Sequence, residues 1–174
     1  SIMKIGEKLD TGPVCNSYKI EIMADDNSET IAEKLSALAA EKLLDNIDEI
    51  LGNKIEFKKQ NHNEATYAAK IKKTEGKIEW SETAEKIIGK VNGLYPSPGA
   101  FFIYNGERYK ILKASLALGS GEIGEVLDNY LEVSCGNKKS IKVLEIQRQG
   151  KRPQNISEFM LGSQIKKGSN LNNA

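Results

Sequence analysis

The residue whose surroundings most suggest chemistry is Asp10, in the stretch EKLDTGPV that runs from Glu7 to Val14. An aspartate before Thr-Gly-Pro is good turn chemistry, because its carboxylate can accept a backbone N–H two residues further on. A carboxylate at the end of a strand also suits catalysis, since α/β sheets bind their ligands at strand ends. Taken alone, the stretch favours a turn residue and leaves the catalytic role open.

Two other side chains have types that suit a functional site. His62 is the only histidine, but it lies between Asn61 and Asn63 in a polar segment with no carboxylate placed to orient it. A solvated loop residue is therefore the better interpretation. Trp80, in KIEWS, is better explained as a structural anchor than as a platform for base stacking.

The cysteines do not form a metal-binding or disulfide pattern. Cys15 and Cys135 lie far apart in the chain and outside any CxxC pairing. With a single histidine, this usage predicts no metal site and a reducing environment. No run of about 18 apolar residues and no signal-like segment is present, so we expect a cytoplasmic protein with no membrane partner.

The net charge of +1 conceals an uneven distribution. Residues 1–52 carry a net charge of −6, whereas residues 81–174 carry +4. A basic C-terminal half can attract a polyanion, but a solvated lysine-rich surface explains the same counts equally well. The cluster GKRP, Gly150–Pro153, is likewise compatible with solvation or with phosphate contact.

The first third of the chain has the pattern of an α/β unit. Strands are expected over Ile2–Ile5 and Val14–Met23, on either side of the loop that holds Asp10. Apolar residues then keep helical spacing as far as Leu51, and Gly52 is a natural stop. This stretch is either one helix or two, with a break near Ala39-Ala40.

The remainder begins as a polar, lysine-rich linker and becomes β-like. Ser81 is the expected cap of a helix that ends at Asn92-Gly93, and Asn155 the expected cap of a short helix. Asn105-Gly106 is the strongest hairpin signal. Strands are expected over residues 100–104, 108–112, 124–128, 130–134 and 140–147. Five or so short strands with one helix predict a small barrel.

Four stretches occur in the order and spacing found in the methionyl-tRNA formyltransferase family. They are MKIGEKLDTGPV, ATYAAKIKKTEGKIEWS, YPSPGAFF with GERYKI, and VLEIQRQGKRP followed by EF and G. The sequence resembles the C-terminal portion of that family over essentially its whole length. It begins without an initiator Met, in strand-like sequence, as expected for the middle of a longer protein.

The resemblance implies an α/β remnant of a Rossmann-like formyltransferase domain followed by a mainly β, OB-fold-like barrel domain with a leading helix. The expected division is residues 1–53 for the end of the catalytic domain, 54–75 for a linker and 76–174 for a tRNA-binding domain. The intact protein is expected to transfer a formyl group from 10-formyltetrahydrofolate to the amino group of initiator Met-tRNA. It is expected to be a cytoplasmic monomer with no obligate protein partner and no metal.

By the same resemblance, Asp10 matches the catalytic aspartate of the family's LDTGP motif. Leu9, Thr11, Gly12 and Pro13 then form the loop beside the folate. The family's catalytic Asn and His precede the region that this chain matches. These 174 residues alone are therefore expected to be inactive while keeping the barrel that binds tRNA.

The resemblance also assigns the tRNA contacts. Lys70 matches a linker lysine near the acceptor end, with Lys72 and Lys73 beside it. The basic residues expected to follow the acceptor arm on the barrel are Lys138, Lys139, Arg148, Lys151 and Arg152.

Two other functions remain open at this point. One is a related folate-dependent formyltransferase or hydrolase that uses a small-molecule acceptor or water. The other is a stand-alone OB-like RNA-binding module, which would leave residues 1–52 without a role.

Overall fold

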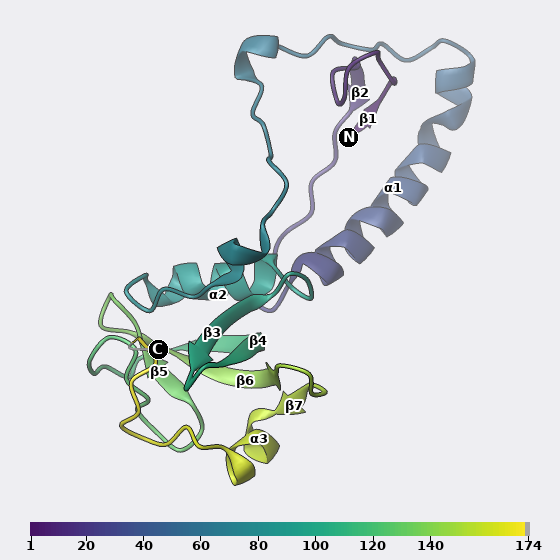
Figure 1. The fold of residues 1–174 in the computed structure, drawn as a ribbon. Helices are drawn as coiled ribbons and strands as arrows, with labels where there is room; N and C mark the ends of the chain where they lie inside the picture. Colours follow the sequence, from purple (N-terminus) through teal and green to yellow (C-terminus); the bar gives the residue numbers. More distant parts are fainter. Residues whose placement is uncertain (173–174) are drawn as a thin grey trace. The chain divides into compact units, whose positions relative to one another are not determined.

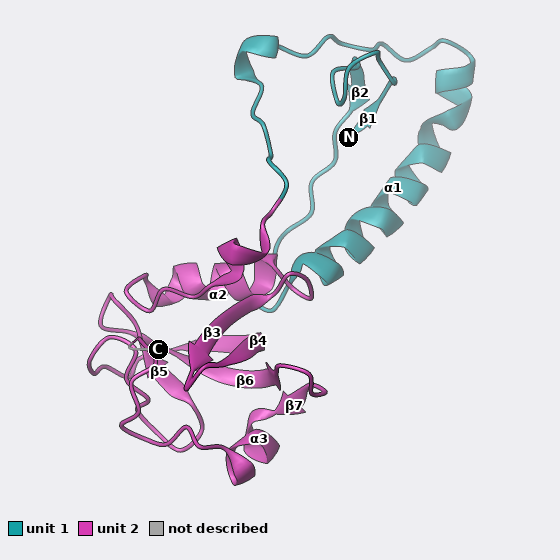
Figure 2. Ribbon diagram, in the orientation of Figure 1, with its two compact units in different colours: residues 1–70 teal, residues 71–174 magenta. Residues whose placement is uncertain are grey.

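The computed structural model describes residues 1–172 and divides the chain into two compact units. Figure 2 distinguishes residues 1–70 from residues 71–174. The boundary falls inside the segment that the sequence predicts to be a linker. Among the described residues, no helix is both long enough and apolar enough to cross a membrane.

The first unit contains a small hairpin and one long helix. Strands β1 (Ile2–Met3) and β2 (Val14–Asn16) pair antiparallel, and Val14 also forms an antiparallel bridge with Lys58. The predicted strand Val14–Met23 is wrong beyond Asn16, and the predicted Ile2–Ile5 ends at Met3. Alternating apolar residues make a strand only where another backbone supplies hydrogen-bond partners, and residues 17–23 lack a paired strand within the described chain.

Helix α1 (Ser28–Leu51) is a single continuous helix (Figure 1). Asn27 caps its start, because its side-chain oxygen accepts from the backbone N–H of Glu29 and of Thr30, at 2.9 and 3.0 Å. Gly52 ends it and donates its N–H to the carbonyl of Asp48, as predicted. Alanine is the best helix former, so Ala39-Ala40 gives no physical cause for a break.

Asp26 stabilises the start of α1 through a buried carboxylate. It accepts from the backbone N–H of Met23 at 2.8 Å and from Lys34 Nζ at 2.6 and 2.7 Å. Lys34 first, and then the Met23 N–H, hold the pKa of Asp26 below its ordinary value of 3.8. The stabilisation is therefore present above pH 3.8 and is lost as the pH falls through the lowered pKa.

We expect Asp26→Asn to lower the helical circular dichroism signal at neutral pH. The difference from the wild-type chain should shrink below pH 3.8 and disappear as the pH falls through the lowered pKa of Asp26, because the wild-type carboxylate is then protonated. Asp25→Asn, at the exposed neighbouring position, is the matched control and should behave like the wild type. An Asp26→Asn defect of equal size at every pH would contradict this explanation.

The second unit is mainly β. Five antiparallel strands form one sheet in the order β3-β4-β6-β5, with β7 paired to β6. Their bounds are β3 (Ala100–Tyr104), β4 (Glu107–Ala117), β5 (Glu132–Ser134), β6 (Ser140–Arg148) and β7 (Gln154–Asn155). The hairpin between β3 and β4 turns at Asn105-Gly106, as predicted, and both residues have positive φ.

The helices of this unit are capped from nearby sequence. Helix α3 (Ile156–Gly162) is capped by Asn155, as predicted. Helix α2 (Ala84–Gly93) is capped by Thr83, so the expected Ser81 cap is wrong. The carbonyl oxygen of Ser81 instead lies so close to the backbone of Gly136 that a Cβ atom at position 136 would be 1.9 Å from this oxygen.

Two further strand predictions need correction. Residues 124–128 form no named strand, only single bridges from Glu125 to Asn170 and from Val126 to Val133. The strand predicted over 108–112 runs instead from Glu107 to Ala117 and so is much longer.

The hydrophobic core belongs to the second unit. Among the described residues, every apolar side chain classed as buried lies between Ile78 and Leu171. Trp80 packs edge-on against Phe102 at 5.8 Å between ring centroids, and Phe102 stacks on Tyr109 at 5.3 Å. Trp80 is 1% exposed, which confirms its predicted role as an anchor.

Candidate active-site loop and basic surface

Asp10 lies in a tightly folded loop of the first unit. Its φ is 55°, in the left-handed region that few non-glycine residues adopt outside turns and functional sites. Thr11 Oγ1 donates to the carbonyl of Lys8 at 2.9 Å, and Lys4 donates its N–H to the carbonyl of Pro13 at 3.0 Å. A Cβ at Gly12 would lie 1.6 Å from the Lys4 carbonyl oxygen, so only glycine allows this closure.

A second segment, far away in sequence, holds this loop. The side-chain amide of Gln60 donates to the carbonyl oxygens of Asp10 and Gly12, at 2.9 and 2.7 Å. The Asp10 loop and the segment that contains Gln60 line a cavity of about 770 Å³. Its lining comprises Leu9, Asp10, Thr11, Gln60, Asn61, His62, Glu64, Ala65, Thr66, Tyr67 and Ala68.

The cavity brings together two residues that the sequence treats separately. His62 is exposed, as predicted, but it lies in the short 3₁₀ helix His62–Glu64 and lines the same cavity as Asp10. Asn61 caps that helix by accepting from the N–H of Asn63 at 3.1 Å. The segment is therefore ordered by its own hydrogen bonds, although its sequence has no clear period.

The predicted basic residues of the second unit form two groups at opposite ends of β6. Lys138 and Lys139 precede the strand, whereas Arg148 ends it and Lys151 and Arg152 follow. Eight residue steps along a strand span roughly 26 Å, so one phosphate cannot contact both groups. Lys139 is paired with Glu85, which leaves Lys138 as the more available cation of its group.

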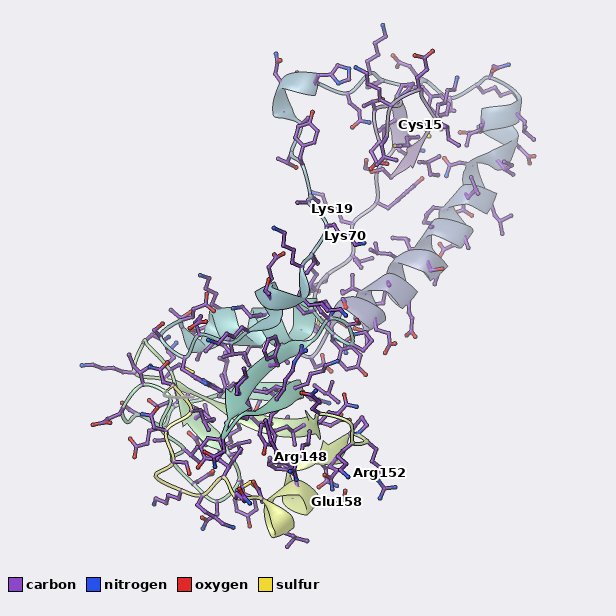
Figure 3. The ribbon with its side chains drawn as sticks, viewed as in Figure 1. Cys15, Lys19, Lys70, Arg148, Arg152 and Glu158 are labelled. Atoms are coloured by element: carbon purple, nitrogen blue, oxygen red, sulfur yellow. The ribbon has the colours of Figure 1, made fainter. Side chains whose placement is uncertain are left out.

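The group at the end of β6 surrounds a cavity of about 340 Å³. Arg148 and Arg152 lie near Glu158 of α3 in Figure 3, and all three residues line this cavity. Arg148 forms an ion pair with Glu107, whose other oxygen accepts from the Tyr109 hydroxyl at 2.8 Å. Arg148, and then Tyr109, hold the pKa of Glu107 below its usual range, while burial raises the pKa of Tyr109 to about 12.

Known proteins match both units of the chain. Residues 70–164 match the family model described as formyl transferase, C-terminal domain. The chain belongs to the formyl transferase family. The match includes the whole sheet and α3, together with the cations at both ends of β6.

Relatives within the formyl transferase family are similar over nearly the whole chain. A methionyl-tRNA formyltransferase of Pelagibacter ubique is 66% identical over 173 residues, which cover 99% of this chain and 56% of that protein. The enzyme of the same name from Thermodesulfovibrio yellowstonii is 38% identical over 95% of this chain and 54% of its own length. The chain thus spans slightly more than half the length of these relatives.

Solved structures share the fold at low identity. HypX from Aquifex aeolicus in complex with tetrahydrofolic acid has a TM-score of 0.71 at 15% identity, covering 95% of this chain and 30% of that one. An N-formyltransferase from Helicobacter canadensis, in complex with folinic acid and dTDP-3-aminofucose, has a TM-score of 0.64 at 21% identity. That match covers 84% of this chain and 54% of the other.

The linker lysines lie on both sides of the boundary between the units. Lys70 is the last residue of the first unit and is exposed (Figure 3). Lys72 and Lys73 begin a short 3₁₀ helix, Lys73–Gly76, in the second. The Lys72 N–H donates to Glu75 Oε1 at 2.6 Å, so the start of this helix is held while the lysine side chains stay exposed.

Two site features escaped the sequence analysis. Glu107 and Tyr109 are two positions apart on β4. Side chains two positions apart lie on the same face of a strand, so this spacing could have indicated that the two residues are neighbours. Gln60 carried no signal, because its partners lie 50 and 48 residues away. Across residues 1–172, no three His, Cys, Asp or Glu side chains are grouped so that they could hold a metal ion.

Proposed function

We propose that the protein containing this chain is a methionyl-tRNA formyltransferase. It transfers a formyl group from 10-formyltetrahydrofolate to the amino group of initiator Met-tRNA. The observation that carries the proposal is the 66% identity to the Pelagibacter ubique enzyme of that name, over 99% of this chain. The closed LDTGP loop supports it, because the loop presents Asp10 at the wall of a cavity.

In this reaction an amine attacks the formyl carbon, an oxyanion develops, and the nitrogen must lose a proton. A carboxylate held beside the amine serves the proton transfer, and we assign that role to Asp10. Leu9, Thr11, Gly12 and Pro13 form the folate side of the loop in this proposal. Leu9 is 90% exposed, which supports its assignment as an apolar contact for the face of a flat folate ring.

The remaining assignments belong to the same proposal. Residues 1–53 complete a Rossmann-like catalytic domain, residues 54–75 are the linker, and residues 76–174 are an OB-like domain that binds tRNA. The linker cations Lys70, Lys72 and Lys73 contact the acceptor end. Lys138, Lys139, Arg148, Lys151 and Arg152 follow the RNA backbone. The intact enzyme acts as a cytoplasmic monomer.

The test is a formyl-transfer assay of the intact gene product. Initiator Met-tRNA should accept the formyl group from 10-formyltetrahydrofolate, while small amines and water should not. Preferred transfer to an amino sugar nucleotide or to water would instead support a related enzyme with another acceptor. The 174-residue chain alone should bind tRNA and transfer nothing, so formyl transfer by this chain would contradict the proposal that it lacks part of the site.

We expect Lys151→Ala and Arg152→Ala each to reduce the salt dependence of tRNA binding. Neither side chain is in an ion pair within residues 1–172, so both are available to phosphate. Losing one phosphate contact should make the slope of the logarithm of the tRNA association constant against the logarithm of the salt concentration shallower by about 0.9. Lys167→Ala, an exposed lysine outside this cavity, is the control. Slopes unchanged in both variants would exclude this cavity from the RNA interface.

A further inference from the structure

The segment that follows Lys58 is attached to the Asp10 loop by hydrogen bonds. Lys58 itself pairs with Val14 of β2. Val14 and Lys58 exchange two backbone hydrogen bonds, each of 2.9 Å. Two residues later, Gln60 donates both amide hydrogens to the loop carbonyls of Asp10 and Gly12. These four bonds fasten the start of the segment to the loop, and residues 60–62 and 64–68 of the segment line the cavity.

The cavity has the size and the lining of a ligand site. Its volume of about 770 Å³ lies within the range of about 300–1,000 Å³ typical of such sites. Tyr67 is 95% exposed on its wall, and Leu9 on the loop is 90% exposed. An exposed aromatic ring and a carboxylate that line one cavity offer two different contacts: a stacking surface and a hydrogen-bond acceptor.

We propose that Tyr67 is the stacking platform for the terminal nucleoside of the acceptor RNA. This inference rests on the proposed function, in which Asp10 faces the amine that receives the formyl group. That amine belongs to an amino acid esterified to the ribose of the last nucleotide, so the base lies one nucleoside away from the reacting atoms. Base–aromatic stacking needs only an accessible ring face, which Tyr67 provides.

Gln60 serves this subsite as a positioning residue. It holds the Asp10 loop and the Tyr67 segment together through two hydrogen bonds to backbone carbonyls, contacts that do not depend on the side chains of the loop. Leu9 and Thr11, which the proposed function assigns to the folate, line the same cavity, so the KM that changes on replacement of Tyr67 decides which substrate its ring contacts.

The test compares KM for the two substrates in the intact gene product. Tyr67→Ala should raise the KM for Met-tRNA by about 5- to 150-fold and leave the KM for 10-formyltetrahydrofolate unchanged. Tyr67→Phe keeps the ring face and should restore the wild-type KM. Tyr130→Ala, which removes a tyrosine 62% exposed in the second unit, is the matched control and should change neither.

The outcomes separate this inference from the proposed function. If the wild-type enzyme formylates Met-tRNA and the Tyr67→Ala variant has an unchanged KM for Met-tRNA, the stacking role alone is overturned. A rise in the folate KM instead would place Tyr67 at the other substrate and would also overturn it. A wild-type protein that does not formylate Met-tRNA would overturn both. Circular dichroism of the Tyr67→Ala and Tyr67→Phe variants shows whether both are folded.

Discussion

Replacing Asp10 with asparagine in the intact gene product is expected to lower kcat for formyl transfer about 10²–10⁴-fold. Asparagine keeps the shape of the side chain but can neither carry the negative charge nor take up a proton. The left-handed backbone at this position tolerates asparagine nearly as well as aspartate, so the loop should keep its conformation. The measurement is steady-state formyl transfer to Met-tRNA, with tRNA binding measured separately.

The matched control for Asp10→Asn is Glu7→Gln. Glu7 is an exposed carboxylate in the same loop, but it does not line the cavity. Its replacement changes the charge of the loop by the same amount, so a general electrostatic effect on RNA approach would appear in both variants. Equal activity losses in the two variants would contradict a catalytic role for Asp10. An activity loss in Asp10→Asn that is fully explained by weaker tRNA binding would contradict it too.

The features that the sequence predicted correctly depend on neighbouring residues. Asn155 is followed three residues later by Glu158, whose N–H it caps. Asn105-Gly106 adopts the two positive φ values that a tight hairpin requires. In both places the side chains and the backbone they affect lie within a few positions, so the spacing in the sequence was sufficient.

The features that the sequence did not predict depend on residues far apart in the chain. Glu107 and Arg148 are 41 residues apart, and antiparallel pairing of β4 with β6 brings them together. Because Arg148 is already paired with Glu107, a count of basic residues overstates the positive charge that is available to phosphate at this end of β6. Gln60 meets the Asp10 loop across 50 residues, and the polar segment around it carries no periodic signal. The sequence therefore predicts a linker over residues 54–75 but does not reveal that part of this segment lines the same cavity as Asp10.

The core of the second unit gives the largest expected effect on stability. Phe102→Ala should lower the free energy of unfolding of this unit by about 3–5 kcal/mol. Phe102 is 2% exposed and lies between Trp80 and Tyr109, so its removal leaves a cavity and ends two ring contacts. Trp80 is the only tryptophan of the chain, so denaturant unfolding followed by its fluorescence reports on this unit.

Phe57→Ala is the matched control for the core, because it removes the same kind of ring from the other unit. Phe57 is half-buried and has Lys4 Nζ above its ring at 4.4 Å, so its loss should affect the hairpin region and not the surroundings of Trp80. The fluorescence transition should therefore shift for Phe102→Ala and stay in place for Phe57→Ala. Since the buried apolar side chains of the described residues all lie in the second unit, equal shifts would mean that the two units unfold together. That result would show that the stability of the second unit depends on the first, although the first contributes no buried apolar side chain among the described residues.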